Sequence, residues 1–175
     1  MRQNGIRALR ASLALLSLVT ALPAGAAVAP KALPVAGRQE RALVVPGNLI
    51  LETKLDTGAR TSSLHAAIIE RHLRDGVEWV GFDIAGNNGH VVRVERPIVR
   101  IAKIKSALGK DESRPVVTLG ICIGNVYRIT EVNLVDRSSL ATPLLIGRRF
   151  LQNRLQVNVN RHHLLDPVCS HAELP

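Results

Sequence analysis

The sequence predicts an all-β fold, either a barrel or a sandwich. Three observations support this: short runs of β-branched residues, turn signals between those runs, and very few segments of helical character. The chain has 175 residues, which is enough for one domain of ordinary size in addition to its N-terminal segment. We therefore expect a single small β domain with an aliphatic core.

The N-terminal residues have the layout of a secretory signal peptide. Residues 1–10 contain three arginines and no acid, residues 11–22 are apolar, and small residues follow at 24–26. This order is typical of a signal that is cleaved near residue 27, and the apolar block is shorter than the roughly 20 residues of a spanning helix. We expect residues 1–27 to be a signal peptide and the protein to be exported, most simply to the periplasm, with no stable membrane insertion afterwards. Residues 28–37, rich in Ala and Pro, are predicted to be a linker.

Pairs of strand-like runs on either side of turn residues predict three hairpins. The turns are Pro46–Asn48, Ala85–Gly89 and Gly124–Asn125, and the runs beside them cover residues 42–45 and 49–55, 77–84 and 91–104, and 114–123 and 126–135. Helix is predicted only at His65–Leu73 and Arg148–Gln152, and both segments are short. Five to eight strands with one or two short helices fit the predicted class.

The charge pattern argues against nucleic acid as a partner. The chain is basic, with a formal net charge of +9, but its arginines are scattered and it has only one Trp, one Tyr and two Phe. Single-stranded nucleic acid is usually bound by basic grooves that also contain stacking aromatic residues. The simplest interpretation of these arginines is a solvated surface, with some attraction for anionic envelope polymers.

Cysteine and histidine spacing leaves one question open. An oxidising compartment would allow Cys122 and Cys169 to form a disulfide, but a buried free thiol and an exposed one fit the sequence equally well. His162 and His163 are adjacent and would point to opposite faces of a strand, and no zinc-binding spacing is present. We predict no metal and no cofactor.

The segment Lys54–Ala66, KLDTGARTSSLHA, allows two interpretations. Asp56 follows an apolar strand, so Asp-Thr-Gly could be an ordinary turn in which the carboxylate accepts backbone N–H bonds. It could also be half of an acid-type active site. The tripeptide alone does not decide between them.

A second motif favours the active site. LLIGR, Leu144–Arg148, follows an apolar run and precedes a short helical stretch, and LDTGA covers Leu55–Ala59. In this order the two motifs resemble those of the retropepsins, the retrovirus-type aspartic proteases. The blocks KLDTGARTSSLHA, IKSALGKDESRPVV, LLIGRRFL and VNVNRHHLL are also similar to a bacterial family with retropepsin-like folds that is commonly labelled an ATP-dependent zinc protease. That similarity covers roughly residues 38–166 and leaves 167–175 as a C-terminal tail.

The resemblance implies a retropepsin-like closed barrel and an aspartic endopeptidase. Asp56 would be the catalytic residue, meeting the Asp56 of a second copy in a homodimer and sharing a proton with it. Thr57 would hydrogen-bond across the two-fold axis, Gly58 and Ala59 would shape the turn, and Ile146 and Gly147 would pack beneath it. The sequence contains neither a Walker motif nor a zinc ligand set, so its residues support neither ATP nor zinc.

The residues after Ala59 are candidates for contact with a peptide or protein substrate. Arg60 stands where viral enzymes usually carry an acid, and it could disturb proton sharing, bind a substrate carboxylate or be an ordinary surface residue. Thr61 and Ser62 are further candidates for substrate contact. Two segments could form a flap over the cleft: Ala85–His90 and Lys105–Ser113.

The sequence therefore supports two alternative functions. The first is an exported, dimeric aspartic endopeptidase. The second is a catalytically inactive retropepsin-fold module that binds a peptide or cell-envelope component, because a fold does not guarantee chemistry.

Overall fold

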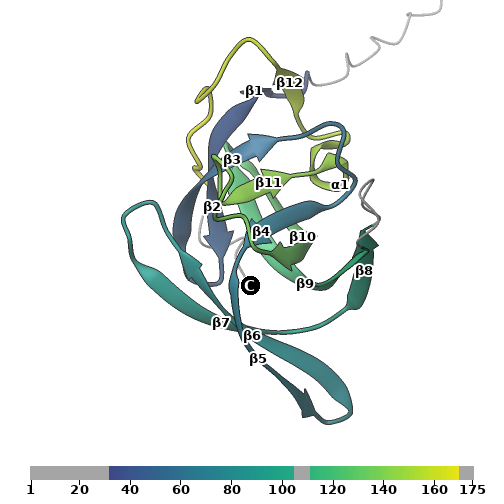
Figure 1. The fold of residues 1–175 in the computed structure, drawn as a ribbon. Helices are drawn as coiled ribbons and strands as arrows, with labels where there is room; N and C mark the ends of the chain where they lie inside the picture. The colour runs from purple at the N-terminus through teal and green to yellow at the C-terminus, as the bar shows by residue number, and fades with distance from the viewer. Residues whose placement is uncertain (1–31, 105–110, 170–175) are drawn as a thin grey trace, which may run out of the picture. The chain divides into compact units, whose positions relative to one another are not determined.

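The computed structural model describes residues 32–104 and 111–169, and that part of the chain is built almost entirely from strands (Figure 1). The predicted signal peptide, residues 1–27, and the first part of the predicted linker lie outside the described residues. The described part contains no helix that is long and apolar enough to cross a membrane.

A closed barrel of six strands forms the centre of the fold. The hydrogen-bonded order is β10-β4-β11-β3-β2-β9, and β9 pairs again with β10, which closes the ring. The strands are β2 (Gln39–Val45), β3 (Leu49–Leu55), β4 (Ser62–His65), β9 (Glu112–Ile123), β10 (Val126–Val135) and β11 (Leu144–Ile146). A seventh strand, β8 (Arg100–Ile104), continues the sheet beyond β9. The predicted all-β, retropepsin-like barrel is confirmed.

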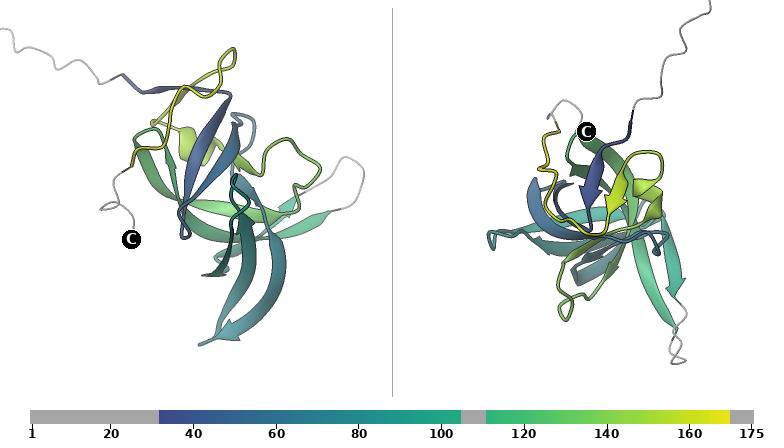
Figure 2. Two further views of the ribbon diagram at one scale, coloured as in Figure 1. Left: turned by 90° about the vertical axis from the view of Figure 1, so that its left-hand side faces the viewer. Right: turned by 90° about the horizontal axis from the view of Figure 1, so that it is seen from above.

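The three predicted hairpins are present. β2 and β3 pair antiparallel around the turn at residues 46–48, and β9 and β10 pair around Gly124–Asn125. The third hairpin joins β6 (Val77–Ala85) to β7 (Val91–Pro97). β5 (Ala67–Arg74) completes this last unit as a separate three-stranded sheet, β5-β6-β7, which is drawn below the barrel in Figure 1 and turned in Figure 2.

The chain changes sheets where one long strand was expected. The predicted run 91–104 divides at Ile98 and Val99, because β7 pairs with β6 whereas β8 pairs with β9. The Ile98 N–H donates to the Glu78 carbonyl at 2.8 Å, and the Val99 N–H donates to the Val116 carbonyl at 2.9 Å. Two adjacent residues thus bond to two different sheets, a feature that strand propensity does not encode.

One of the two predicted helices is wrong and the other is confirmed. Residues 65–73, predicted as helix, lie in β4 and β5 and pair with β10 and β6. Long-range pairing overrides the weak local preference here, and two consecutive isoleucines favour a strand. The predicted helix at residues 148–152 is present as α1 (Arg148–Leu151).

The predicted linker extends too far. Residues 35–37 form β1 (Val35–Gly37), which pairs in parallel with β12 (Gln156–Asn158), a strand more than a hundred residues away in sequence. Gly37 is required there, since a Cβ on it would lie 2.5 Å from the His162 Cα. Three residues with so distant a partner carry no local strand signal.

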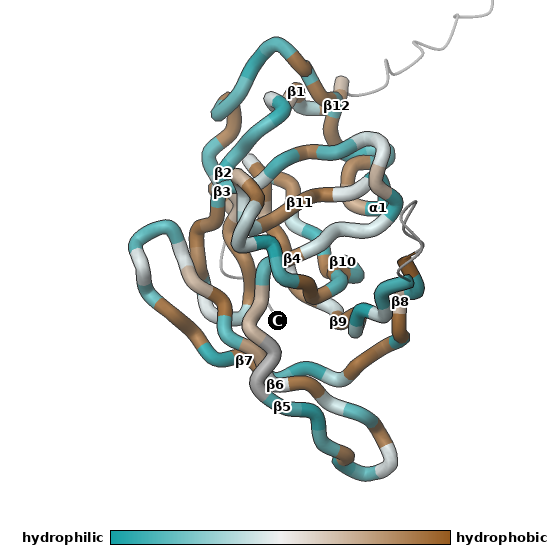
Figure 3. Tube along the Cα trace, viewed as in Figure 1, coloured by the Kyte–Doolittle hydropathy of each residue, from teal (hydrophilic) through white to brown (hydrophobic). Residues whose placement is uncertain are grey.

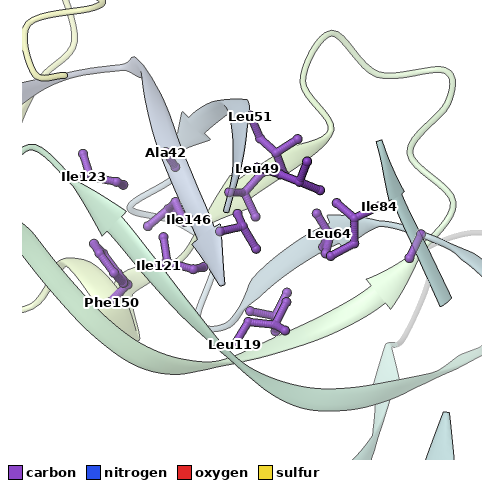
Figure 4. Packing of buried hydrophobic residues seen from close by; sticks show 14 of the residues in the cluster. Ala42, Leu49, Leu51, Leu64, Ile84, Leu119, Ile121, Ile123, Ile146 and Phe150 are labelled. Carbon is purple, nitrogen blue, oxygen red and sulfur yellow. The ribbon is translucent and has the colours of Figure 1, made fainter. Parts of the chain in front are cut away.

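The barrel interior is aliphatic, as expected from the few aromatic residues. Figure 4 shows Leu51, Leu64, Ile121 and Ile146 among the side chains that converge inside the barrel, with Phe150 of α1 beside them. Hydrophobic and hydrophilic residues alternate along several of the strands (Figure 3), as expected for strands with one face on a core. Burial of this apolar surface is the main driving force for closure of the barrel.

Glu40 is a fully buried carboxylate that binds the C-terminal segment to the barrel. Its Oε1 accepts the N–H groups of Gly37 at 2.5 Å and Leu164 at 3.0 Å, and its Oε2 accepts the Leu165 N–H at 3.0 Å. A buried charge is tolerated when such bonds replace its water.

Cys122 and Cys169 form a disulfide, which resolves the alternative that the sequence left open. The bond joins a buried position on β9 to the predicted tail, and the Val168 N–H donates to the Gly124 carbonyl at 2.8 Å. The described start of the tail, residues 167–169, is therefore attached to the β9–β10 hairpin.

Removal of the disulfide is expected to destabilise the fold. The bond spans 47 residues, and loop-closure entropy then predicts that the Cys122→Ala, Cys169→Ala variant loses about 2–4 kcal/mol of unfolding free energy. Urea unfolding followed by circular dichroism measures this. Reductant should lower the wild-type midpoint and leave the variant unaffected; equal midpoints for the two proteins without reductant would contradict the prediction.

Glu40→Ala is expected to cost about 3 kcal/mol, because one buried and two part-buried backbone N–H groups lose their acceptor. Glu52→Ala is the matched control. The Glu52 carboxylate forms a more exposed contact, 2.8 Å from His163, so its loss should cost less than about 1 kcal/mol. The same urea titration compares the two variants. Equal losses of unfolding free energy would disprove the role given to Glu40.

Candidate active site

Asp56 begins a tight turn at the end of β3. Its N–H donates to the Ile146 carbonyl at 2.9 Å, and its Oδ1 accepts the N–H groups of Gly58 at 2.8 Å and Ala59 at 3.2 Å. The side chain is half-buried. These bonds fix the orientation of the carboxylate relative to the barrel, so the turn presents an acid in a defined position.

The two motifs found in the sequence meet directly. β11 lies parallel to β3, with Ile146 opposite Leu55, and the N–H groups of Arg148 and Arg149 donate to the carbonyls of Ala59 and Arg60. These last two bonds are 2.8 and 3.1 Å long. The segment that contains the Asp56 turn is therefore hydrogen-bonded to the start of α1.

Gly147 allows this contact. A Cβ at this position would lie 2.7 Å from the carbonyl carbon of Thr61 and 2.9 Å from its oxygen, so any larger residue would push the two segments apart. The Gly147 N–H donates to the Ser62 Oγ at 3.1 Å. The glycine of the second motif is thus explained by backbone-to-backbone packing.

The remaining predicted site residues divide into two groups. Thr57, Gly58 and Arg60 are exposed, whereas Ile146 and Gly147 are buried beneath the turn. Ser62 was expected to contact substrate, and here the structure differs: its side chain is buried and its hydroxyl supports Gly147. Ser62 is therefore a structural residue of the site.

The first flap candidate, residues 85–90, is attached to the outside of the barrel. The Asn87 N–H donates to the Ile50 carbonyl, and the Asn87 side chain accepts the Glu52 N–H, both at 3.0 Å. Of the second candidate, residues 105–110 lie outside the described residues. The strands on either side of it, β8 and β9, are antiparallel neighbours, and β8 lines the cavity beside the Asp56 turn.

A cavity of about 810 Å³ opens next to the turn, and its lining is strongly cationic. Ala59, Arg60 and Thr61 form one wall. The other cationic side chains come from β8, β9, the β10–β11 loop and α1: Arg100, Lys103, Arg114, Arg137 and Arg149. No acidic side chain lines this cavity within the described part of the chain.

Arg137 is the most buried of these cations, with 8% of its surface exposed. Its Nε donates to the Thr142 carbonyl at 3.2 Å and its Nη1 to the Ser63 Oγ at 3.0 Å. Burial and the Arg114 charge lower the pKa of the Arg137 guanidinium, and the Asp56 carboxylate acts in the opposite direction. Arg137 forms no ion pair with an acid among residues 32–104 and 111–169.

Glu131 forms ion pairs with two of the cations that line the cavity. Its Oε2 accepts from Arg100 Nη2 at 2.6 Å and from Arg149 Nη1. The hydrogen bond from Arg100, followed by the charges of both arginines, lowers the pKa of the Glu131 carboxyl. Glu131 therefore stays ionised and holds Arg100 and Arg149 in place, whereas Arg60, Lys103 and Arg137 form no ion pair with an acid in the described part of the chain.

A possible metal-ligand cluster lies elsewhere. Glu70 and His72 on β5 and Glu95 on β7 have ligand atoms within 4.8 Å of one another. Both carboxylates also bind arginines: Glu70 is 3.1 Å from Arg93, and Glu95 is 3.2 Å from Arg74. We interpret the cluster as an ion-pair network on the three-stranded sheet.

Sequence reasoning missed most of the cationic cavity. The arginines lie far apart along the chain, and each by itself has the character of a solvated surface residue. Only barrel closure brings β8, β9 and α1 to one place. A local signal for this cavity is absent, because its residues share no motif or spacing.

Comparison with known proteins gives several relatives. Over 120 residues the chain is 34% identical to a protein of Shewanella pealeana, and over 111 residues it is 32% identical to one of Desulfotalea psychrophila; both are named "Probable alpha-L-glutamate ligase". The matches cover 67% and 62% of this chain but only 26% and 24% of the relatives. The chain thus spans about a quarter of the length of these proteins, and their name describes the whole of each.

A solved structure also matches. A crystal structure of a Legionella pneumophila protein of unknown function superposes with a TM-score of 0.64 at 32% sequence identity. The match covers 75% of this chain and 97% of the other.

The model of one protein family matches residues 35–167, a range that begins at β1 and contains both the Asp56 turn and Gly147. The family is described as "Retropepsin-like aspartic endopeptidase RimB". Together with the closed barrel, this match shows that the chain belongs to the RimB-like family of retropepsin-like aspartic endopeptidases.

Proposed function

We propose that this protein is an exported, homodimeric aspartic endopeptidase that cleaves peptides carrying clustered carboxylates. The observation that carries the proposal is the Asp56 turn, where two backbone N–H groups orient a half-buried carboxylate beside a large cavity. Family membership supports the same chemistry.

The reaction needs two carboxyl groups that share one proton. Two carboxylates at close range cannot both ionise cheaply, so one remains protonated. The ionised Asp56 takes a proton from a water, the water oxygen attacks the scissile carbonyl carbon, and the protonated Asp56 of the second copy donates to the carbonyl oxygen. The tetrahedral intermediate then breaks its C–N bond: the first Asp56 passes the proton it took from water to the amine nitrogen. The Asp56 of the second copy takes back a proton from a hydroxyl of the intermediate as the C=O bond forms again.

The second carboxyl group would come from a second copy of the chain. The sequence contains one Asp-Thr-Gly, and Thr57 and Gly58 are exposed in the single chain. A two-fold axis at this turn would bring the two Asp56 side chains together and bury the exposed tip. Thr57 is then placed to hydrogen-bond across the axis.

The charge of the cavity indicates the class of substrate. Cations from five parts of the chain line the cavity beside the Asp56 turn, and Arg137 is buried there without an acidic partner in the described part of the chain. Guanidinium groups bind carboxylates with paired, charge-assisted hydrogen bonds. The relatives' name, a glutamate ligase, makes glutamate-containing peptides the first substrates to test.

Export rests on two features. Residues 1–27 have the layout of a signal peptide, and Cys122 and Cys169 form a disulfide. Disulfides of this kind persist in oxidising compartments such as the periplasm.

A binding module remains the second candidate, because Arg137 and Arg60 lie beside the site. Nearby cations favour ionised carboxylates and would oppose proton sharing between two Asp56 side chains. In that case the cavity would bind acidic peptides without cleaving them.

Asp56→Asn is expected to lower the rate of cleavage of a diverse peptide library at least about a hundredfold between about pH 4 and 7, since it removes the acid and base of the reaction. Mass spectrometry of the products measures this. Asp75→Asn, an exposed acid in the β5–β6 turn, is the control and should leave the rate unchanged.

Mixing the two proteins tests the dimer. Excess Asp56→Asn chain should inhibit the wild type by forming mixed pairs, whereas Asp75→Asn chain should not. Cleavage that persists in Asp56→Asn would refute the aspartic mechanism. Binding of acidic peptides without any cleavage by the wild type would establish the binding module instead.

Substrate charge is expected to control affinity. A glutamate-rich peptide should be cleaved with a KM at least about tenfold lower than its glutamine counterpart, and raising the salt concentration should narrow the difference. Arg60→Gln should raise the KM for the glutamate peptide alone. Arg161→Gln removes the same charge outside the cavity and should leave the KM of both peptides unchanged. Equal KM values for the two peptides in the wild type would exclude an acidic substrate class.

A further inference from the structure

A second cavity lies beside the first and is also cationic. It has a volume of about 460 Å³ and is formed by β10 and by the residues in and after α1. The residues that line it are Arg128, Ile129, Thr130, Glu131, Arg149, Gln152, Asn153 and Arg154. Three of these are arginines and one is an acid.

The single acid is already engaged. The Glu131 carboxylate pairs with Arg149 and with Arg100, and Arg100 belongs to the first cavity. Arg128 donates from Nη1 to the Arg149 carbonyl at 2.8 Å. This acceptor is neutral, so it does not offset the charge of Arg128. Neither Arg128 nor Arg154 forms an ion pair with an acid in the described ranges, so the second cavity keeps an excess of positive charge.

Arg149 is common to the two cavities, because it belongs to the lining of both. Glu131 fixes that side chain at the boundary. An extended peptide advances about 3.4 Å per residue, so a long enough chain seated in the first cavity would pass Arg149. Its next carboxylates would then meet Arg128 and Arg154.

We propose that the second cavity is an accessory binding site for the continuation of an acidic peptide held at the Asp56 site. It lets the protein distinguish long acidic chains from short ones. The cavity also offers neutral hydrogen-bonding groups, the side chains of Gln152 and Asn153, both of them exposed. This inference rests on the acidic substrate class of the proposed function, but it does not depend on cleavage.

Binding measurements with two peptides test the site. The probes are fluorescein-labelled oligoglutamates of about three and about ten residues, which span roughly 10 and 34 Å when extended. Fluorescence anisotropy with the full chain carrying Asp56→Asn gives dissociation constants while the peptides stay intact. The long peptide should bind at least about tenfold more tightly, since it alone reaches both cavities.

Arg154→Gln, introduced into the chain that carries Asp56→Asn, should weaken binding of the long peptide about fivefold. The affinity for the short peptide should stay unchanged. Arg154 is chosen over Arg128 because Arg128 also holds the Arg149 carbonyl. Arg161→Gln, which lies outside both cavities, is the matched control and should affect neither peptide.

The possible failures can be told apart. If Arg154→Gln weakens the binding of both peptides equally, or weakens neither, the accessory site is overturned and the acidic substrate class is unaffected. Failure of both peptides to bind before Arg154 is changed would overturn the substrate class and this inference together.

Discussion

The close approach of Gly147 to the backbone at Thr61 is the constraint on which the site depends. Only a residue without a Cβ allows this distance, and the contact holds the segment after Asp56 against the start of α1. Ser62 adds to it by accepting the Gly147 N–H. The position of the catalytic candidate is therefore fixed by a glycine about ninety residues later in the sequence, which explains why the two motifs belong together.

Charge is the second organising feature of the molecule. Buried cations are costly unless they are paired, and Arg137 satisfies part of its guanidinium with two neutral oxygens. Glu131 in contrast binds Arg100 and Arg149 and fixes them on one side of the cavity. The protein thus keeps some cations in ion pairs and leaves others along the lining of a shared cavity, an arrangement that costs stability because buried charges lose their water.

Sequence patterns predicted the secondary structure correctly wherever the pattern came from neighbouring residues. The hairpin turns, the strands beside them and α1 were predicted because turn residues and alternation act over a few positions. The predicted helix at residues 65–73 and the predicted single strand 91–104 failed for one reason. In both, the chain passes from one sheet to another, and its partners are decided by barrel closure instead of by neighbouring residues.

The sequence by itself determined the all-β class and the two motifs around Asp56 and Gly147, because each is encoded by adjacent residues with distinct conformational demands. Only the tertiary structure decided that Cys122 and Cys169 pair and that the scattered arginines share a cavity. Those features depend on distances between segments far apart along the chain. Such distances are set when the apolar strand faces close on a common core, which no local pattern of residues records.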